Sequence, residues 1–378
     1  AIDAHKRILA IAPQDLAAEE ALLTLYEKTK KWAALVEHYN DRLRRLPSDD
    51  VEHRLETLFR LIEVYQSPER LPSEDQVLAT YARIVEVSPT NREALMTLSQ
   101  GYQTRERWSD LLRVLQRRVE ATQDPGELLD LFHQIAEVAI TRMSNETQAI
   151  PFLERILELD PANLDVVRTL KGIYERKRNQ EKLFSMQVRE LSMMDGRDRE
   201  THLLSAAHMA KERLFKYDEA LRLFEEVHAT NPDNEDAKAN LHQIYVRMER
   251  WPAYAKFLEH EIARAPAHKR PDLMQRLGEL LLERINDPAA ARRQFEAILA
   301  VQPNNDPARR RLEGILLDAG DLDALSDRFA ERGGAAAFVA MLAGREARET
   351  DVAKQVRLNL AMAFACEQDL RDPNRALT

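Results

Sequence analysis

The sequence has little of three residue types: one cysteine and 10 glycines occur in 378 residues, and aromatic residues make up only 6%. The lone Cys366 cannot form an internal disulfide and cannot supply a cysteine-based zinc site. So few glycines argue against a β-rich fold. Long apolar runs are missing too, because the most apolar run, Ala335 to Leu342, is far shorter than the roughly 20 residues that cross a bilayer. We therefore expect a soluble protein without membrane insertion.

A surplus of positive charge is also absent. The chain carries 55 Lys and Arg against 64 Asp and Glu, a formal net charge of −9. This balance disfavours a general nucleic-acid binder held by bulk charge. At the same time, 44% of the residues are apolar, which is too many for a disordered chain.

The common motifs of catalysis and ligand binding do not occur in the sequence. It contains no G-x-G-x-x-G, G-x-x-x-x-G-K-[ST], H-E-x-x-H or C-x-x-C. The ten histidines are scattered; His202 and His208, six residues apart, fall on different sides of a helix. We therefore expect no cofactor, no metal site and no catalytic centre in this sequence.

Five prolines that follow near-identical apolar segments reveal an internal repeat. They are separated by 76, 72, 71 and 71 residues and stand at Pro13, Pro89, Pro161, Pro232 and Pro303. A fixed period of this kind indicates a repeat architecture. It predicts a single continuous solenoid over 1–378, with units at about 1–13, 14–89, 90–161, 162–232, 233–303 and 304–378.

The residues after each proline repeat as well. Two positions on stand short polar residues suited to cap a helix start: Asp15, Asn91, Asn163, Asn234 and Asn305. Nine positions on stand Leu22, Leu98, Leu170, Leu241 and Leu312. Thirteen positions on stand Tyr26, Tyr102, Tyr174, Tyr245 and Leu316, and nineteen on stand Trp32, Trp108, Gln180, Trp251 and Leu322. Positions nine and thirteen are one helical turn apart, which places leucine and tyrosine on one helix face, and the step from thirteen to nineteen crosses a turn into a second helix.

A second hairpin precedes each proline. A small residue twelve positions before it and a large one eight before it would let neighbouring helices interlock; the later examples are Ala149 with Leu153, Ala220 with Phe224 and Ala291 with Phe295. Each unit is therefore predicted to hold four helices. The fold class is all-α, a right-handed superhelix of about ten helical hairpins.

This pattern resembles the tetratricopeptide repeat family. The matching residues are Asn234, Ala237, Leu241, Tyr245 and Trp251 in one hairpin and Ala220, Phe224 and Pro232 in another. The resemblance covers essentially the whole sequence, although most repeats lack the glycine that follows the leucine in the family. Half-a-TPR proteins of RNA processing are a related alternative, which the pattern leaves open.

Two segments interrupt the period. About five extra residues and two prolines lie between Gln66 and Asp75, where we expect a surface loop. About 14 residues are added near 333–347, where paired glycines should end one helix and an Ala-rich stretch should form a short additional one. There Phe338, Val339, Met341 and Leu342 either fill the gap between hairpins or offer an apolar docking patch, with Phe338, Met341 and Leu342 as its candidate residues.

Cations recur at the ends of the first helices: Lys28, Lys30 and Lys31; Arg105 and Arg107; Arg176, Lys177 and Arg178; Arg247 and Arg250. In the fifth unit, acids replace them: Asp318, Asp321 and Asp323. Stacking would align these cations as an edge ridge, with Arg176, Arg178, Arg247 and Arg250 as candidate contacts for an anionic partner. Cations also favour a helix C-terminus by about 0.3 to 1 kcal/mol, which is the simpler explanation. No surface aromatics accompany the ridge for base stacking.

In peptide-binding members of the family, first-helix residues clamp a terminal carboxylate with a Lys and Asn pair. The resemblance places Glu20 with Thr24, Met96 with Gln100, Arg168 with Gly172, Ala239 with Gln243 and Arg310 with Gly314 at these positions, so the clamp is missing. The predicted groove still carries hydrogen-bonding side chains, which could hold a partner segment or be merely solvated: Gln100, Gln103, Arg168, Asn240, Gln243 and Arg310.

The function expected from this pattern is a non-catalytic scaffold or adaptor that binds one or more proteins. For an Arg- and Ala-rich, bacterial-looking chain, the resemblance implies a role in polarity, motility, secretion or envelope assembly. The alternatives are an RNA-processing helical repeat and the regulatory solenoid of a larger enzyme. We expect a cytoplasmic location. The first residues, without a start methionine, and the last, at the start of an expected helix, suggest a fragment of a longer protein.

Overall fold

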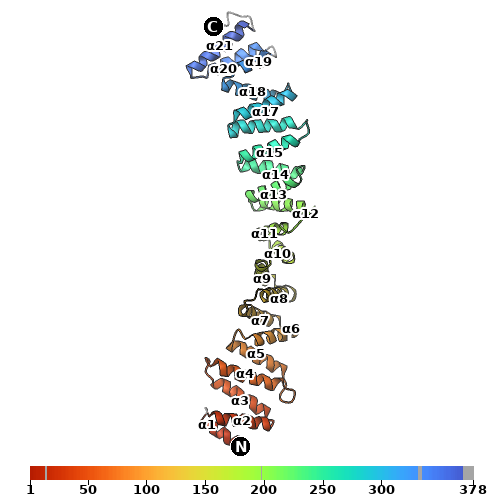
Figure 1. The fold of residues 1–378 in the computed structure, drawn as a ribbon, viewed down its shortest axis with the longest axis vertical. Coiled ribbons are helices and arrows are strands. Elements are labelled where there is room, and N and C mark those ends of the chain that lie inside the picture. Colours follow the sequence, from red (N-terminus) through yellow and green to blue (C-terminus); the bar gives the residue numbers. More distant parts are fainter. Residues whose placement is uncertain (13–14, 197, 331–333, 369–378) are drawn as a thin grey trace. The chain divides into compact units, whose positions relative to one another are not determined.

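The computed structural model describes residues 1–12, 15–196, 198–330 and 334–368. These residues form 21 α-helices, and helices that follow one another in sequence pack in pairs (Figure 1). The described ranges contain no β-strand, so the all-α prediction is confirmed, and the fold is a tetratricopeptide-like array of helical repeats. The chain divides into two compact units, residues 1–202 and 203–378.

The helices of each compact unit follow the predicted order of four per repeat. Residues 1–202 hold α1 (Ile2–Ile11), α2 (Leu16–Lys28), α3 (Trp32–Arg45), α4 (Val51–Gln66), α5 (Glu74–Val87), α6 (Arg92–Thr104), α7 (Trp108–Ala121), α8 (Pro125–Glu137), α9 (Glu146–Leu159), α10 (Leu164–Arg176), α11 (Gln180–Leu191) and the start of α12 (Asp198–His208). The second unit continues with α13 (Tyr217–Thr230), α14 (Glu235–Arg247), α15 (Trp251–Arg264), α16 (Arg270–Leu280), α17 (Pro288–Val301), α18 (Asp306–Ala319), α19 (Leu322–Ala330), α20 (Ala335–Glu346) and α21 (Val352–Gln368).

The predicted capping residues begin the first helix of every repeat. Each side-chain oxygen accepts a hydrogen bond, of 2.9 to 3.1 Å, from the backbone N–H three residues on. These bonds satisfy amides that the helix itself leaves unpaired. The caps are Asp15, Asn91, Asn163, Asn234 and Asn305. Pro13, the first of the repeating prolines, lies outside the described residues.

The repeated apolar residues form the core, as predicted. All five leucines nine positions after the prolines are buried, and so are the four tyrosines and Leu316 thirteen positions after them. From the second hairpins, Ala220, Phe224, Ala291 and Phe295 are fully buried. Burial of one apolar stripe per helix against its neighbours is the main stabilising term of such arrays.

Three π-helical turns were not predicted. They extend α8, α12 and α16 at equivalent places, over Val138–Arg142, Met209–Arg213 and Leu281–Ile285. In two of these turns an arginine of the turn lies above a repeated tryptophan: Arg142 is 5.2 Å from the Trp108 ring and Arg284 is 5.2 Å from the Trp251 ring.

For the first tryptophan, the arginine above the ring comes from the loop between α4 and α5 and not from a π-helical turn. This loop falls where the first interruption of the period was predicted, and its Arg70 lies 5.2 Å from the Trp32 ring. All three tryptophans of the chain therefore have the same kind of neighbour. The arginines recur in the sequence at nearly the tryptophan period, which is the signal that could have predicted these cation–π contacts.

The turn between the two helices of a first hairpin uses a left-handed backbone at a residue with a side chain. Glu249, for example, has φ 53°, whereas the equivalent residue of the next repeat is Gly320, with φ 72°. A left-handed conformation costs a residue with a Cβ roughly 1 to 2 kcal/mol.

Replacing Glu249 by glycine is expected to stabilise residues 203–378 by about 1 kcal/mol, because glycine does not pay that cost. Urea unfolding would measure the difference. Glu249→Ala is the control: alanine keeps the Cβ, so its stability should stay close to that of the unchanged chain. Equal stability of the Gly and Ala variants would contradict the argument.

The Ala-rich part of the second insertion forms the predicted short helix, α20, with Gly334 at its start. Phe338 is 2% exposed and packs 5.5 Å from the ring of Phe329, and Leu342 is fully buried. Phe338 and Leu342 therefore fill the space around α19 and α20 and offer no exposed docking surface. Gly333 and residues 369–378 lie outside the described residues.

Candidate functional site

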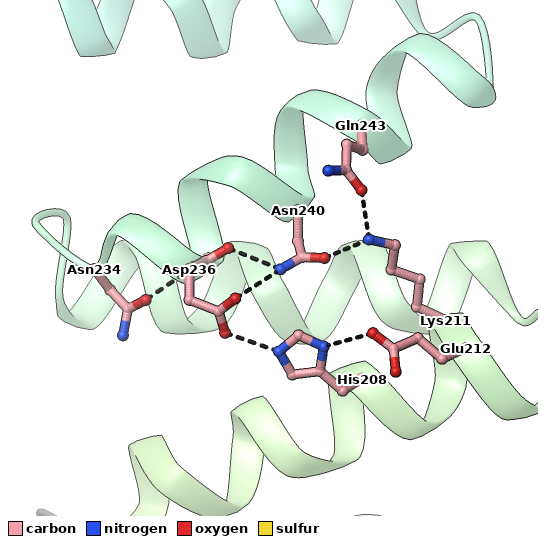
Figure 2. Close-up of polar contacts among 8 residues, drawn as sticks. His208, Lys211, Glu212, Asn234, Asp236, Asn240 and Gln243 are labelled. Atoms are coloured by element: carbon pink, nitrogen blue, oxygen red, sulfur yellow. Dashed lines mark hydrogen bonds and ion pairs between the residues drawn. The ribbon is translucent and has the colours of Figure 1, made fainter.

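The candidate site is a polar cluster on the two neighbouring first helices α12 and α14 (Figure 2). It consists of His208, Lys211, Glu212, Asp236, Asn240 and Gln243, which we call the Lys211 cluster. The π-helical turn after α12 supplies Lys211, and the cap by Asn234 fixes the start of α14. Asp236, Asn240 and Gln243 then follow at helical spacing, so they share one face of α14.

Lys211 reaches from one helix to the other. Its ammonium donates to Asn240 Oδ1 at 2.5 Å and to Gln243 Oε1 at 2.7 Å. Both acceptors are neutral amides, and among the described residues no carboxylate lies within ion-pair distance of this lysine. Two neutral acceptors therefore position the ammonium of Lys211, while the carboxylates of the cluster, Glu212 and Asp236, lie near His208 instead.

Asn240 is the most constrained member of the cluster. It is 6% exposed, and its amide donates to the backbone oxygen of Asp236 at 2.9 Å and to the Oδ1 atom of the same residue at 3.0 Å. Its amide oxygen accepts a hydrogen bond from Lys211. Asn240, itself fixed by its bonds to Asp236, therefore holds the lysine in place. Gln243 is exposed, and its amide nitrogen points away from Lys211 (Figure 2).

His208 forms the other end of the cluster. Its two ring nitrogens lie 2.8 Å from Asp236 Oδ2 and 3.2 Å from Glu212 Oε1. The ring also packs edge-on against Phe224, 5.3 Å away. His208 therefore connects the polar face of α12 and α14 to the buried core beneath it.

The remaining predicted groove residues do not join this cluster. Arg168, in the other compact unit, lies 3.3 Å from Glu190, which also accepts from Lys171 at 2.6 Å. Burial alone would raise the pKa of Glu190, but the bond and charge of Lys171, together with Arg168, hold it below its usual value. Gln100, Gln103 and Arg310 are exposed. Of the six, the structure brings together only Asn240 and Gln243, through a lysine that was not predicted.

Two of the four candidate edge cations are already paired. Arg176 lies 2.6 Å from Glu146, in the first turn of α9, and Arg250 pairs with Asp218, in the first turn of α13. Both bonds connect a first hairpin with the helix before it. Such exposed pairs contribute about 0 to 1 kcal/mol each, and they leave less free positive charge on this edge than the sequence indicates.

The other two edge cations differ from each other. Arg247 lies above the ring of Tyr217, 4.6 Å from its centroid, so its charge is directed at an aromatic face. Arg178 is exposed, in a turn with φ 55°. Met341, the third residue of the predicted apolar patch, is half-buried.

The described ranges offer neither a metal site nor a membrane-spanning helix. No cluster of three or more His, Cys, Asp and Glu there could hold a metal ion, and none of the described helices is long and apolar enough to cross a membrane. Cys366 is buried, 1% exposed.

Comparison with known proteins identifies one segment by sequence. Residues 213–277, from the end of the π-helical turn after α12 to α16, match the model of the tetratricopeptide repeat family. No curated protein matches the chain.

Solved structures of several helical-repeat proteins are similar to the chain. YrrB, described as a TPR protein with an unusual peptide-binding site, is 14% identical; the match covers 51% of this chain and 98% of YrrB, with a TM-score of 0.26. A tetratricopeptide repeat protein from Parabacteroides merdae is 14% identical over 69% of this chain and 98% of its own, with a TM-score of 0.25. The TPR domain of P58(IPK) is 12% identical over 94% and 98%, with a TM-score of 0.22. Identities and scores this low carry no conclusion about partners.

Proposed function

We propose that this protein is a non-catalytic scaffold or adaptor, and that the Lys211 cluster holds a segment of a partner protein. The observation that carries the proposal is the ammonium of Lys211, fixed between the amide oxygens of Asn240 and Gln243 and not directly paired with a carboxylate among the described residues. A carboxylate of a bound segment would complete this arrangement with a charge-assisted hydrogen bond. The exposed amide of Gln243 is available to the backbone of the same segment.

The architecture supports a binding role in a second way. Helical repeats present long faces without requiring them for stability, because each repeat is stabilised by its neighbours. In this chain the caps, the leucines and the tyrosines carry that packing, so residues such as Gln243 and Arg310 are free to vary with the partner.

The wider setting of this function is part of the proposal. We propose that the repeats form one continuous solenoid, located in the cytoplasm, and that the protein organises a larger assembly. Polarity, motility, secretion and envelope machinery are the settings that the resemblance suggests.

A library of short displayed peptides, selected on the purified chain, tests the binding role. We expect selected segments to share an acidic residue or a terminal carboxylate and to bind Lys211→Met at least about tenfold more weakly, the loss expected for one charge-assisted bond. Fluorescence anisotropy of the selected peptides would give the dissociation constants.

The control for this experiment is Lys28→Met, which removes an exposed lysine at the end of α2 in the other compact unit. It should leave binding unchanged. Selection of segments without acidic groups, or equal affinity for the unchanged chain and Lys211→Met, would contradict the proposed site.

A further inference from the structure

A second binding feature lies between the second helices α13 and α15, away from the Lys211 cluster. It is a pocket of about 480 Å³ with α14 beneath it, a size within the range of ligand sites. Leu241 and Phe257 form its apolar floor, and Ala229 and Ala253 stand on its two walls. We call it the α13–α15 pocket.

A small side chain at position 253 keeps this pocket open. In the preceding repeat the equivalent residue is Lys182, which bonds to Glu154 at 2.8 Å and so spans the same gap between α9 and α11. Glu225 is the equivalent of Glu154. It accepts a hydrogen bond from the Tyr245 hydroxyl at 2.6 Å, but Ala253 stands at the position of the lysine. The exchange of lysine for alanine therefore removes a bridge and leaves a hollow.

The rim of the pocket on α15 is positively charged. Lys256, His260 and Arg264 follow one another at intervals of four, so they lie in a row on one face of the helix. All three are exposed, and among the residues that the structure describes, no carboxylate forms an ion pair with them. The row therefore presents unneutralised positive charge beside an apolar hollow.

An equivalent pocket in the first compact unit carries its charges in a different arrangement. It lies between α1, α2 and α3, has a volume of about 520 Å³, and again has an alanine, Ala34, on the wall. The two pockets are related residue by residue at a distance of 219 positions, with Lys6, Glu37 and Asp41 in place of Glu225, Lys256 and His260. Arg45, the equivalent of Arg264, is basic in both pockets. The hollow is thus repeated while the charges at three of its positions differ, which indicates that those three charges are not needed for the packing of the helices.

We infer that the α13–α15 pocket docks an acidic segment of a partner protein that presents one large apolar side chain. The apolar side chain enters between Ala229 and Ala253 and covers the floor formed by Phe257. Carboxylates on either side of it meet Lys256 and Arg264. Charge complementarity selects an acidic over a basic segment, because Lys256 and Arg264 are exposed on the rim and form no ion pair among the described residues. This site is separate from the Lys211 cluster and does not depend on it.

The probe for this inference is a short peptide with one benzoylphenylalanine flanked by glutamates, and its counterpart is the same peptide with lysines. Photo-crosslinking to the full chain, read by mass spectrometry, is expected to place the acidic peptide on α13 and α15, near Ala229 and Ala253. Fluorescence anisotropy is expected to show at least tenfold tighter binding of the acidic peptide, and the difference should shrink as salt is added.

Two variants test the site from different directions. Ala253→Lys restores the bridge to Glu225 seen in the preceding repeat and should lower affinity for the acidic peptide at least tenfold while the fold is kept. The double variant Lys256→Glu with His260→Asp introduces the two acidic residues that the α1–α3 pocket has at these positions, beside the unchanged Glu225. It should reverse the preference, so that the lysine peptide binds better.

Lys211→Met separates this inference from the proposed function, since it should leave binding of the acidic probe unchanged. Crosslinks outside α13 and α15, or unaltered binding to Ala253→Lys, would overturn the inference. The inference would also be overturned if a single-stranded RNA oligonucleotide displaced the acidic peptide with an affinity equal to that of the peptide itself. The cations would then bind a phosphate backbone.

Discussion

Phe224→Ala is expected to lower the free energy of unfolding of residues 203–378 by about 4 kcal/mol, the middle of the range for a buried phenylalanine. The ring is 0% exposed and lies against His208 and the core beside Ala220. Its removal takes away the transfer free energy of the side chain and leaves a cavity that helices fixed by their neighbours cannot close. Urea unfolding followed by circular dichroism would measure the loss.

The same variant should act locally. In a repeat array the helices next to a defect lose protection first, so hydrogen exchange should accelerate in α12, α13 and α14. Phe215→Ala is the matched control, because Phe215 is 66% exposed and its removal should change stability by no more than about 0.5 kcal/mol. Similar losses for the two variants would show that the core does not lie where the structure puts it.

Acid is expected to destabilise residues 203–378 through His242. Burial, with the nearby charges of Arg276, His228 and Lys238 adding to it, lowers the pKa of His242 from 6.5 to about 4. The ring lies 3.0 Å from the Tyr254 hydroxyl oxygen, a contact that a neutral ring nitrogen can accept.

The sign of the effect follows from the two states. In the unfolded chain His242 takes up a proton near pH 6.5, whereas in the folded chain it stays neutral until about pH 4. The stability it contributes is therefore complete above pH 6.5 and is lost as the pH falls to about 4, by less than about 3 kcal/mol in all, because solvent screens the partly exposed ring. Urea unfolding at several pH values would give the slope.

His242→Gln should flatten that slope, because glutamine fills much of the space without titrating. His268→Gln, at an exposed position in the segment between α15 and α16, is the control and should keep the slope of the unchanged chain. A His242→Gln variant that loses stability between pH 6.5 and 4 as steeply as the unchanged chain would show that another group is responsible.

The candidate site was only partly predictable. Asn240 and Gln243 stand on the predicted face of a first helix, so helical spacing was enough to find them. Lys211 was missed because it lies in a π-helical turn, where the extra residue per turn shifts side chains away from the positions that an α-helical period predicts. The predicted ridge shows the same limit: Arg176 and Arg250 are where the sequence puts them, but their carboxylate partners come from the preceding hairpin.

What the sequence determined by itself is the repeat: the period of about seventy residues, the capping residues, the leucine and tyrosine core and the all-α class. These depend on contacts between residues close in the chain, and local contacts follow from spacing. What only the tertiary structure decided is which charges are paired, which hollows stay open and which helix ends are π-helical. A salt bridge or a pocket depends on side chains from separate helices, such as Lys182 with Glu154 or Ala253 with Glu225. Their meeting is fixed only when the hairpins stack.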